Sequence, residues 1–300
     1  MVSPEGREYY TRLRETPSFG ACGFDIEGLR QGMSTRRPPG DPAVRCVHVD
    51  VAGIPGEWVL APGSDPDLRL LYLHGGGFVS GSGAFYLALA GHLSAAGGCA
   101  VLLPDYRLAP EDPFPAALED CIRAHEWLTM NGPGGPGPAR ATFIAGDSAG
   151  GGLTLSVLMA LRDRGLCLPA AGIALSPFAD LTLGGESVCS QGDLDPIMHP
   201  RCLPEFVERY IGDGDARDPL ASPVFGDFAG LPPILLQVGE HEVIRDDSVR
   251  VAERARAGGV DVTLEIWEGM FHVFQSHEPL LPEAREAIDH VGALIRSVPA

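Results

Sequence analysis

The sequence contains no lysine, so all 22 of its basic side chains are arginines, against 40 aspartates and glutamates. The resulting net charge of −18 argues against nucleic acid or an anionic membrane surface as a partner. No apolar run reaches the roughly 20 residues that a membrane-spanning helix needs. Residues 1–7 lack the apolar segment of a secretory signal, so no such signal is expected at this end.

Paired cysteines are also missing. The seven cysteines are odd in number and never form a Cys-x-x-Cys pair; they are Cys22, Cys46, Cys99, Cys121, Cys167, Cys189 and Cys202. This pattern argues against a disulfide framework and against a zinc site, and it favours a reducing compartment. We therefore expect a soluble, cytoplasmic protein.

Short apolar runs alternate with stretches of helical periodicity along the 300 residues. Strands are expected at 70–73, 99–103, 141–145, 172–175, 234–238 and 262–267, and helices at 84–96, 116–131, 150–164, 246–257 and 283–297. An antiparallel hairpin is expected at 44–51 and 57–61, with its turn at 53–56. Together these elements predict an α/β fold with a mostly parallel, eight-stranded sheet and helices on both faces.

Two segments fall outside this alternation. Residues 1–40 carry two short helical stretches before the first strand, and residues 183–214 form a turn-rich insertion with one stretch of helical spacing. We expect both to form a small helical cap over a catalytic domain that spans 41–300, although the insertion could also be an ordinary long loop. The Gly/Pro-rich stretch 132–138 is expected to be a surface loop.

The pentapeptide Gly146-Asp147-Ser148-Ala149-Gly150 lies between an expected strand and an expected helix. This context is the one that a G-x-S-x-G nucleophile elbow requires, because only small neighbours allow so sharp a turn. The start of the helix lies under Ser148, where unpaired N–H groups and the helix dipole favour an oxyanion. The sequence therefore predicts Ser148 as a nucleophile, rather than an incidental serine in a glycine-rich turn.

A second glycine-rich motif, His74-Gly75-Gly76-Gly77, follows the expected strand 70–73. In α/β hydrolases this loop supplies backbone N–H groups to the oxyanion hole, and glycines let the backbone approach the substrate oxygen. We expect the donors to be Gly75, Gly76 and Ala149. His74 precedes the nucleophile, whereas the triad of this fold runs serine, acid, histidine, so a structural role is expected for it.

The acid and the base should follow the next strands at the same edge of the sheet. Behind strand 234–238 stand Glu240, Glu242, Asp246 and Asp247, of which the two aspartates fit the first turn of a helix. The residues alone leave both loop glutamates open as the triad acid. Behind strand 262–267, His272 is closer to the strand end than His277 and is preferred as the base.

These motifs together resemble the hormone-sensitive-lipase-like family of α/β-hydrolase esterases, bacterial family IV. The resemblance is carried by residues 74–78, 105–111, 146–151, 218–223 and 269–272, in that order. It implies that Glu242 is the triad acid, although many members have aspartate there, and that 105–111 and 218–223 brace loops near the site. It also implies a roofed acyl pocket, for which five apolar residues are candidates that could equally be core: Phe78, Met198, Phe206, Met270 and Phe274.

The expected function is that of a serine carboxylesterase acting on short- to medium-chain acyl esters through Ser148, His272 and Glu242. The substrate is a small molecule, and the mechanism requires no metal or organic cofactor. Two alternatives stay open: an amidase, aryl formamidase or deacetylase with the same triad, and a non-catalytic small-molecule receptor of the same fold. A homodimer through the last strand and helix is compatible with such a sheet.

Overall fold

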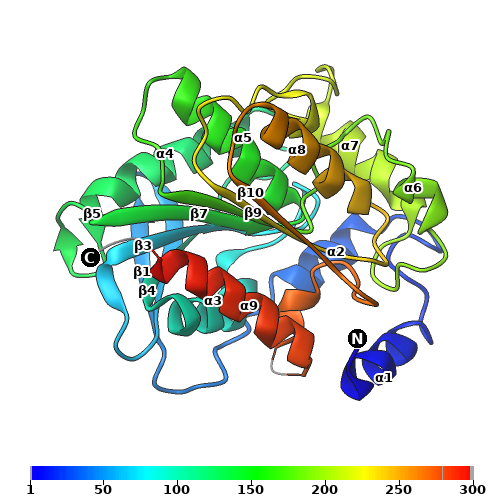
Figure 1. The fold of residues 1–300 in the computed structure, drawn as a ribbon, viewed down its shortest axis with the longest axis horizontal. Helices are drawn as coiled ribbons and strands as arrows, with labels where there is room; N and C mark the ends of the chain where they lie inside the picture. The colour runs from blue at the N-terminus through cyan, green and yellow to red at the C-terminus, as the bar shows by residue number, and fades with distance from the viewer. Residues whose placement is uncertain (1, 279, 298–300) are drawn as a thin grey trace.

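A computed structural model of the chain, which describes residues 2–278 and 280–297, contains one eight-stranded sheet in the order β1-β2-β4-β3-β7-β8-β9-β10 (Figure 1). β1 and β2 pair antiparallel, as do β2 and β4, and all other neighbours are parallel. The strands are β1 Arg45–Val51, β2 Ile54–Leu60, β3 Asp65–Leu73, β4 Cys99–Pro104, β7 Ala141–Asp147, β8 Ala171–Leu175, β9 Ile234–Gly239 and β10 Val262–Trp267. The predicted α/β fold with a mostly parallel sheet is confirmed.

Helices cover both faces of this sheet (Figure 1). On one face, α3 (Gly83–Gly97) packs against α9 (Pro282–Arg296), and on the other lie α4 (Ala116–Met130), α5 (Ala149–Asp163) and α8 (Arg245–Ala257). Each of these five helices begins and ends within one residue of its predicted position.

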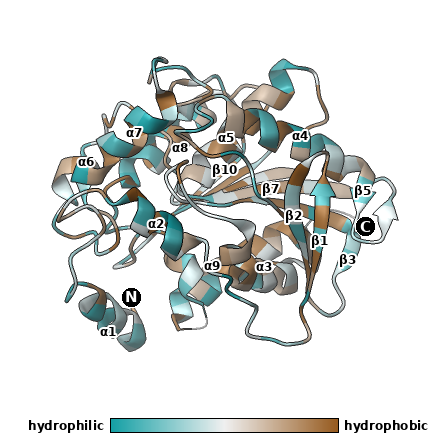
Figure 2. Ribbon diagram, turned by 180° about the vertical axis from the view of Figure 1, so that it is seen from behind, coloured by the Kyte–Doolittle hydropathy of each residue, from teal (hydrophilic) through white to brown (hydrophobic). Residues whose placement is uncertain are grey.

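The central strands are buried on both faces, so their sequences are apolar runs rather than alternating ones. Figure 2 shows this hydrophobic material in the middle of the molecule, with hydrophilic residues on the outer helices. In β7 every residue from Thr142 to Asp147 is buried, including the carboxylate at its end. Each fully buried Leu, Ile or Phe side chain of this core contributes roughly 1.5–3 kcal/mol, which fixes the strand ends that carry the polar residues.

Two local predictions are wrong. The hairpin turn consists of Ala52 and Gly53 alone, both with positive φ (54° and 86°), as a two-residue turn matching the strand twist requires. β2 therefore already begins at Ile54 and includes Gly56, where a side chain would crowd the carbonyl of Leu103. The stretch 132–138 is not all loop, since β5 (Asn131–Gly132) pairs with β6 (Gly135–Pro136).

The two expected cap segments contain four helices and lie at the carboxyl end of the sheet (Figure 1). They are α1 Pro4–Leu13, α2 Ile26–Met33, α6 Ser187–Ser190 and α7 Leu203–Ile211. The segments meet directly, because Phe19 forms a β-bridge with Met198. The side chains of Ser3 and Asp25 accept hydrogen bonds from Gly6 and Gly28 and thereby begin α1 and α2. Within the described residues no helix is long and apolar enough to cross a bilayer.

Candidate active site

Ser148 stands at a sharp turn between β7 and α5. Its backbone has φ 51° and ψ −119°, a conformation that an L-residue adopts only when its surroundings impose it. A side chain at Gly146 would overlap the carbonyl of Gly150, and one at Gly150 would overlap the carbonyl of Leu73. The glycines thus let the strand, the helix and the neighbouring loop pack around the serine, as the sequence predicts.

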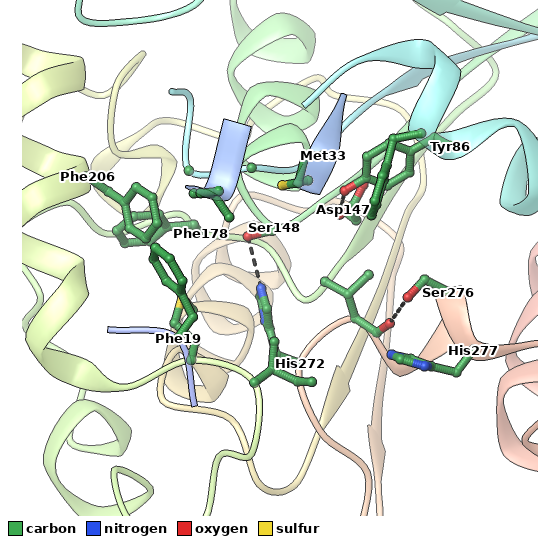
Figure 3. Close-up of a pocket in the computed structure, with 17 residues that line it drawn as sticks. Phe19, Met33, Tyr86, Asp147, Ser148, Phe178, Phe206, His272, Ser276 and His277 are labelled. Atoms are coloured by element: carbon green, nitrogen blue, oxygen red, sulfur yellow. Dashed lines mark hydrogen bonds between the residues drawn. The ribbon is translucent and has the colours of Figure 1, made fainter. Parts of the chain in front are cut away.

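The three residues expected to form a triad are brought together at the carboxyl edge of the sheet. The Nε2 atom of His272 lies 3.0 Å from Ser148 Oγ, and its Nδ1 atom lies 2.9 Å from Glu242 Oε2. Figure 3 shows His272 pointing up to the serine hydroxyl. All three side chains are buried, so these hydrogen bonds lie in a medium of low dielectric constant.

The second carboxylate oxygen of Glu242 is hydrogen-bonded to groups outside the predicted site. Its Oε1 accepts hydrogen bonds from Gly239 N–H and from the hydroxyl of Ser176 (2.7 Å). That hydroxyl in turn accepts from Val273 N–H at 3.1 Å, so Ser176 connects the acid loop with the base loop. Sequence reasoning missed Ser176, although its position immediately after β8 places it at the same sheet edge.

The alternative acid and base lie elsewhere. Glu240 accepts a hydrogen bond from Gly269 N–H at 2.9 Å and does not contact His272. His277 pairs through Nδ1 with the hydroxyl of Tyr9 at 2.8 Å, and burial, with the charge of Arg37, lowers its pKa to about 4. The structure therefore places His272 beside Ser148, and Glu242 beside His272.

His74 holds its own loop. It stacks on Tyr106 with ring centroids 4.2 Å apart, while its Nδ1 lies 2.8 Å from the carbonyl oxygen of Gly75. Burial lowers the pKa of His74. Asp246 and Asp247 begin α8 as expected.

The expectation that Gly75 donates to an oxyanion is wrong. Its N–H is already used, since it donates to Asp147 Oδ1 at 2.9 Å, with Tyr86 Oη at 3.2 Å. Gly76 and Gly77 line the cavity beside Ser148, and within the described residues their N–H groups and that of Ala149 have no protein acceptor. The three free donors are therefore Gly76, Gly77 and Ala149.

Asp147 explains this shift by one residue. Its buried carboxylate accepts from the hydroxyls of Tyr72 and Tyr86, both at 2.8 Å, as well as from Gly75. Burial raises the pKa of Asp147 to about 6, although these hydrogen bonds oppose the change. The glycine loop is thus anchored at Gly75, which leaves the two glycines after it facing the cavity.

Carboxylates set the electrostatics of His272. Burial by itself would lower its pKa, but the hydrogen bond and charge of Glu242, with the charges of Asp195 and Asp147, raise it above 6.5. A neutral imidazole can take a proton from Ser148, and a raised pKa favours the imidazolium that then forms. Within 2–278 and 280–297 no group of three His, Cys, Asp or Glu side chains is arranged to hold a metal.

A cavity of about 190 Å³ opens beside Ser148. Phe19, Phe178 and Phe206 lie on one side of the serine, and Met33 and Tyr86 on the other (Figure 3). Of the five pocket candidates from the sequence, Met198 and Phe206 line it. The other three belong to the packed core, namely Phe78, Met270 and Phe274. Six of the 17 lining residues come from the two expected cap segments, and the others from the sheet edge and the loops and helices beside it.

The chain is similar to known hydrolases. Residues 70–276 match a family with the α/β-hydrolase fold. An acetyl-hydrolase of Streptomyces hygroscopicus is 44% identical over 87% of this chain and 83% of its own length. An esterase of Acinetobacter venetianus is 33% identical over 87% of this chain and 84% of its own. These relatives are hydrolases, so they do not favour a non-catalytic receptor.

Solved structures are similar over the whole chain. EstE5 soaked with p-nitrophenyl butyrate is 41% identical, with a TM-score of 0.91 and 99% of each chain covered. An esterase from the bacterial hormone-sensitive lipase family is 40% identical, with a TM-score of 0.88 and the same coverage. The chain belongs to the hormone-sensitive-lipase-like (bacterial family IV) carboxylesterases of the α/β-hydrolase superfamily.

Proposed function

We propose that this carboxylic ester hydrolase cleaves short-chain acyl esters with Ser148 as nucleophile, His272 as base and Glu242 as the acid that orients it. The observation that carries the proposal is the continuous pair of hydrogen bonds from Ser148 Oγ through both nitrogens of His272 to Glu242 Oε2. With Nδ1–H donating to the carboxylate, Nε2 is free to accept the serine proton.

The reaction follows from these positions. His272 takes the proton of Ser148 Oγ while that oxygen attacks the ester carbonyl, which becomes a tetrahedral oxyanion. The N–H groups of Gly76, Gly77 and Ala149 receive the oxyanion, and one such donor is typically worth on the order of 100- to 1,000-fold in kcat. His272 then gives its proton to the leaving alcohol. Water, activated by the same imidazole, hydrolyses the acyl-enzyme.

The size of the cavity supports short acyl chains. Its volume of about 190 Å³ is below the roughly 300–1,000 Å³ of sites that take drug-sized ligands. Aromatic rings close one side, since Phe206 packs on Phe19 and Phe24 with centroids 5.9 and 5.0 Å apart. We expect kcat/KM to be highest for acetate to butyrate among p-nitrophenyl esters and to fall steeply at longer chains.

Substitution of the serine tests the nucleophile. Ser148→Ala should lose kcat on p-nitrophenyl butyrate by on the order of 10⁶-fold, as in other serine hydrolases, and should no longer react with a fluorophosphonate probe. The matched control is Ser190→Ala, an exposed serine on the cap helix α6, which should keep the wild-type rate. Hydrolysis by Ser148→Ala close to the wild-type rate would remove this serine from the role.

Deacetylation is a second candidate, favoured by two observations. The cavity is small, and two relatives are named for acetyl removal: the Streptomyces hygroscopicus acetyl-hydrolase, and a putative acetyl-hydrolase of Mycobacterium tuberculosis that is 39% identical over 93% of this chain. The same triad serves esters and amides, so comparing p-nitrophenyl acetate with p-nitroacetanilide separates the two. An amide rate within about tenfold of the ester rate would favour an amidase.

A further inference from the structure

Asp195 is a buried carboxylate of the cap insertion that the proposed reaction does not use. Only 4% of its surface is exposed. Its Oδ1 accepts hydrogen bonds from the N–H groups of Ile197 (2.9 Å) and Met198 (3.1 Å), and its Oδ2 accepts from Val243 N–H at 3.1 Å. One side chain therefore joins the cap to the loop that carries the triad acid.

One end of this connection lies at the cavity, and the other lies next to the proposed triad acid. Ile197 and Met198 line the active-site cavity, and the backbone of Phe19 bonds on either side of Met198, through Ile197 O and His199 N. Val243 directly follows Glu242. Without Asp195, the buried N–H of Val243 would have no acceptor, which typically costs about 1–3 kcal/mol and would allow the acid loop to move.

The charges around Asp195 are unusual because no permanent cation balances it. In the part of the chain that the structure describes, no arginine lies within 4 Å of it, and the sequence has no lysine. Titratable groups that interact with it electrostatically include Glu242, His272, Tyr10 and Cys202. Of these four, only His272 can become positive.

Burial raises the pKa of Asp195 to about 6, the charge of Glu242 adds to this, and a positive His272 opposes it. A buried carboxylate without a counterion is unfavourable, so a positive charge that forms near it is stabilised. That cation forms when His272 takes the proton of Ser148.

We propose that Asp195 is a positioning residue for the catalytic base: it fixes the Glu242 loop against the cap and stabilises the imidazolium of His272 as it forms. The inference rests on the proposed function. It also means that the wall of the acyl pocket and the acid–base pair share one anchor, so the cap takes part in setting the geometry of the triad.

The test is Asp195→Asn, with Asp193→Asn as the matched control. The asparagine oxygen can still accept from Ile197 and Met198, but its amino group would face the N–H of Val243, so the cap contact is kept and the loop contact is lost. Asp193 lies in the same cap segment, and its side chain is exposed. Both variants remove one negative charge.

We expect Asp195→Asn to reduce kcat per titrated serine by about tenfold or more, in line with the loss of a hydrogen bond to a charged group. The acidic limb of kcat/KM should move to lower pH, because a carboxylate that raises the pKa of His272 is gone. Asp193→Asn should match the wild type in both. A kcat per serine within about twofold of wild type, or an unmoved limb, would overturn the proposal.

A second measurement covers a variant that fails to fold. In the wild-type protein, the ¹³Cγ resonance of Asp195 should show two inflections with pH, one for its own titration and one for the titration of His272. A curve with only the first inflection would overturn the proposal. Because kcat is expressed per serine labelled by fluorophosphonate, failure of this inference leaves labelling intact. Failure of the proposed function would already abolish labelling of the wild type.

Discussion

Replacement of Glu242 by glutamine tests the triad most directly, because the change keeps size and shape and alters one group. Glu242 accepts three hydrogen bonds: from Gly239 N–H and Ser176 Oγ on Oε1, and from His272 on Oε2. An amide has only one oxygen, so it satisfies one side or the other. The Oε1 side holds two donors and the Oε2 side one, and the amide oxygen is therefore expected to stay with Gly239 and Ser176.

The amino group of the glutamine then faces His272 Nδ1. The imidazole must accept there and carry its proton on Nε2, the atom that faces Ser148. In this tautomer it cannot act as a base. The equivalent change in serine proteases lowers kcat by about 10⁴-fold, or about 5.4 kcal/mol at 1.36 kcal/mol per factor of ten. We expect the same order for Glu242→Gln, with KM close to the wild-type value.

The assay is steady-state hydrolysis of p-nitrophenyl butyrate, with fluorophosphonate titration to count folded sites. Glu240→Gln is the control, since the amide oxygen can still accept from Gly269 N–H, and its kcat should stay within about twofold of wild type. Retention of more than about a tenth of the wild-type kcat by Glu242→Gln would refute the reasoning. A larger loss in Glu240→Gln would reverse the assignment of the acid.

Two further predictions concern charge near the site. The kcat/KM of the wild type should fall as the pH drops through the raised pKa of His272, because the protonated imidazole cannot accept the proton of Ser148. A pH-stat assay should place the midpoint of this limb above the ordinary pKa of a histidine, and a midpoint below that ordinary value would contradict the prediction. Asp147→Ala should lower kcat by about tenfold or more with little change in KM, because all three accepted hydrogen bonds are lost and Gly75 loses the carboxylate that holds it. Tyr86→Phe, which leaves Asp147 bonded to Gly75, should lose less, and equal losses would argue against an anchored glycine loop.

The fold was predictable because its central strands are apolar runs and its main helices show helical periodicity, and both patterns are local in the sequence. The apolar run at 262–267 is β10 to the residue, and every major helix begins and ends within one residue of its predicted position. β3 begins earlier than predicted. Its first part was missed because it contains polar residues, among them Arg69, and so is not an apolar run. That guanidinium is buried by donating to the carbonyls of Pro66, Leu128 and Gly137, and two of these partners are distant in sequence.

The site residues that directly follow a strand could be predicted from the sequence. The residues whose role depends on a tertiary hydrogen bond could not. Ser148, Glu242 and His272 follow β7, β9 and β10, and the carboxyl ends of these parallel strands lie at one edge of the sheet, which brings the three residues together. The choice among three successive glycines depends on Asp147, whose carboxylate takes the N–H of Gly75. Nothing in the run of glycines itself indicates which N–H is used in this way.

The chain's shortage of cations gives the site its polarity. Three buried carboxylates surround His272: Glu242, Asp147 and Asp195. They would destabilise an oxyanion if they faced it, but Asp147 is shielded by two tyrosine hydroxyls and Gly75, and Asp195 by three backbone N–H groups. The oxyanion position beside Ser148 is instead met by free N–H groups and the start of α5.

Positive charge is therefore favoured on the imidazole and negative charge on the substrate oxygen, which is the charge separation that ester cleavage by a serine creates. An arginine or lysine beside Asp195 would neutralise that carboxylate, and positive charge on the imidazole would then be less favoured. We thus expect a cation introduced there, for example by Cys202→Arg, to lower the pKa of His272 and to reduce kcat even where the protein folds.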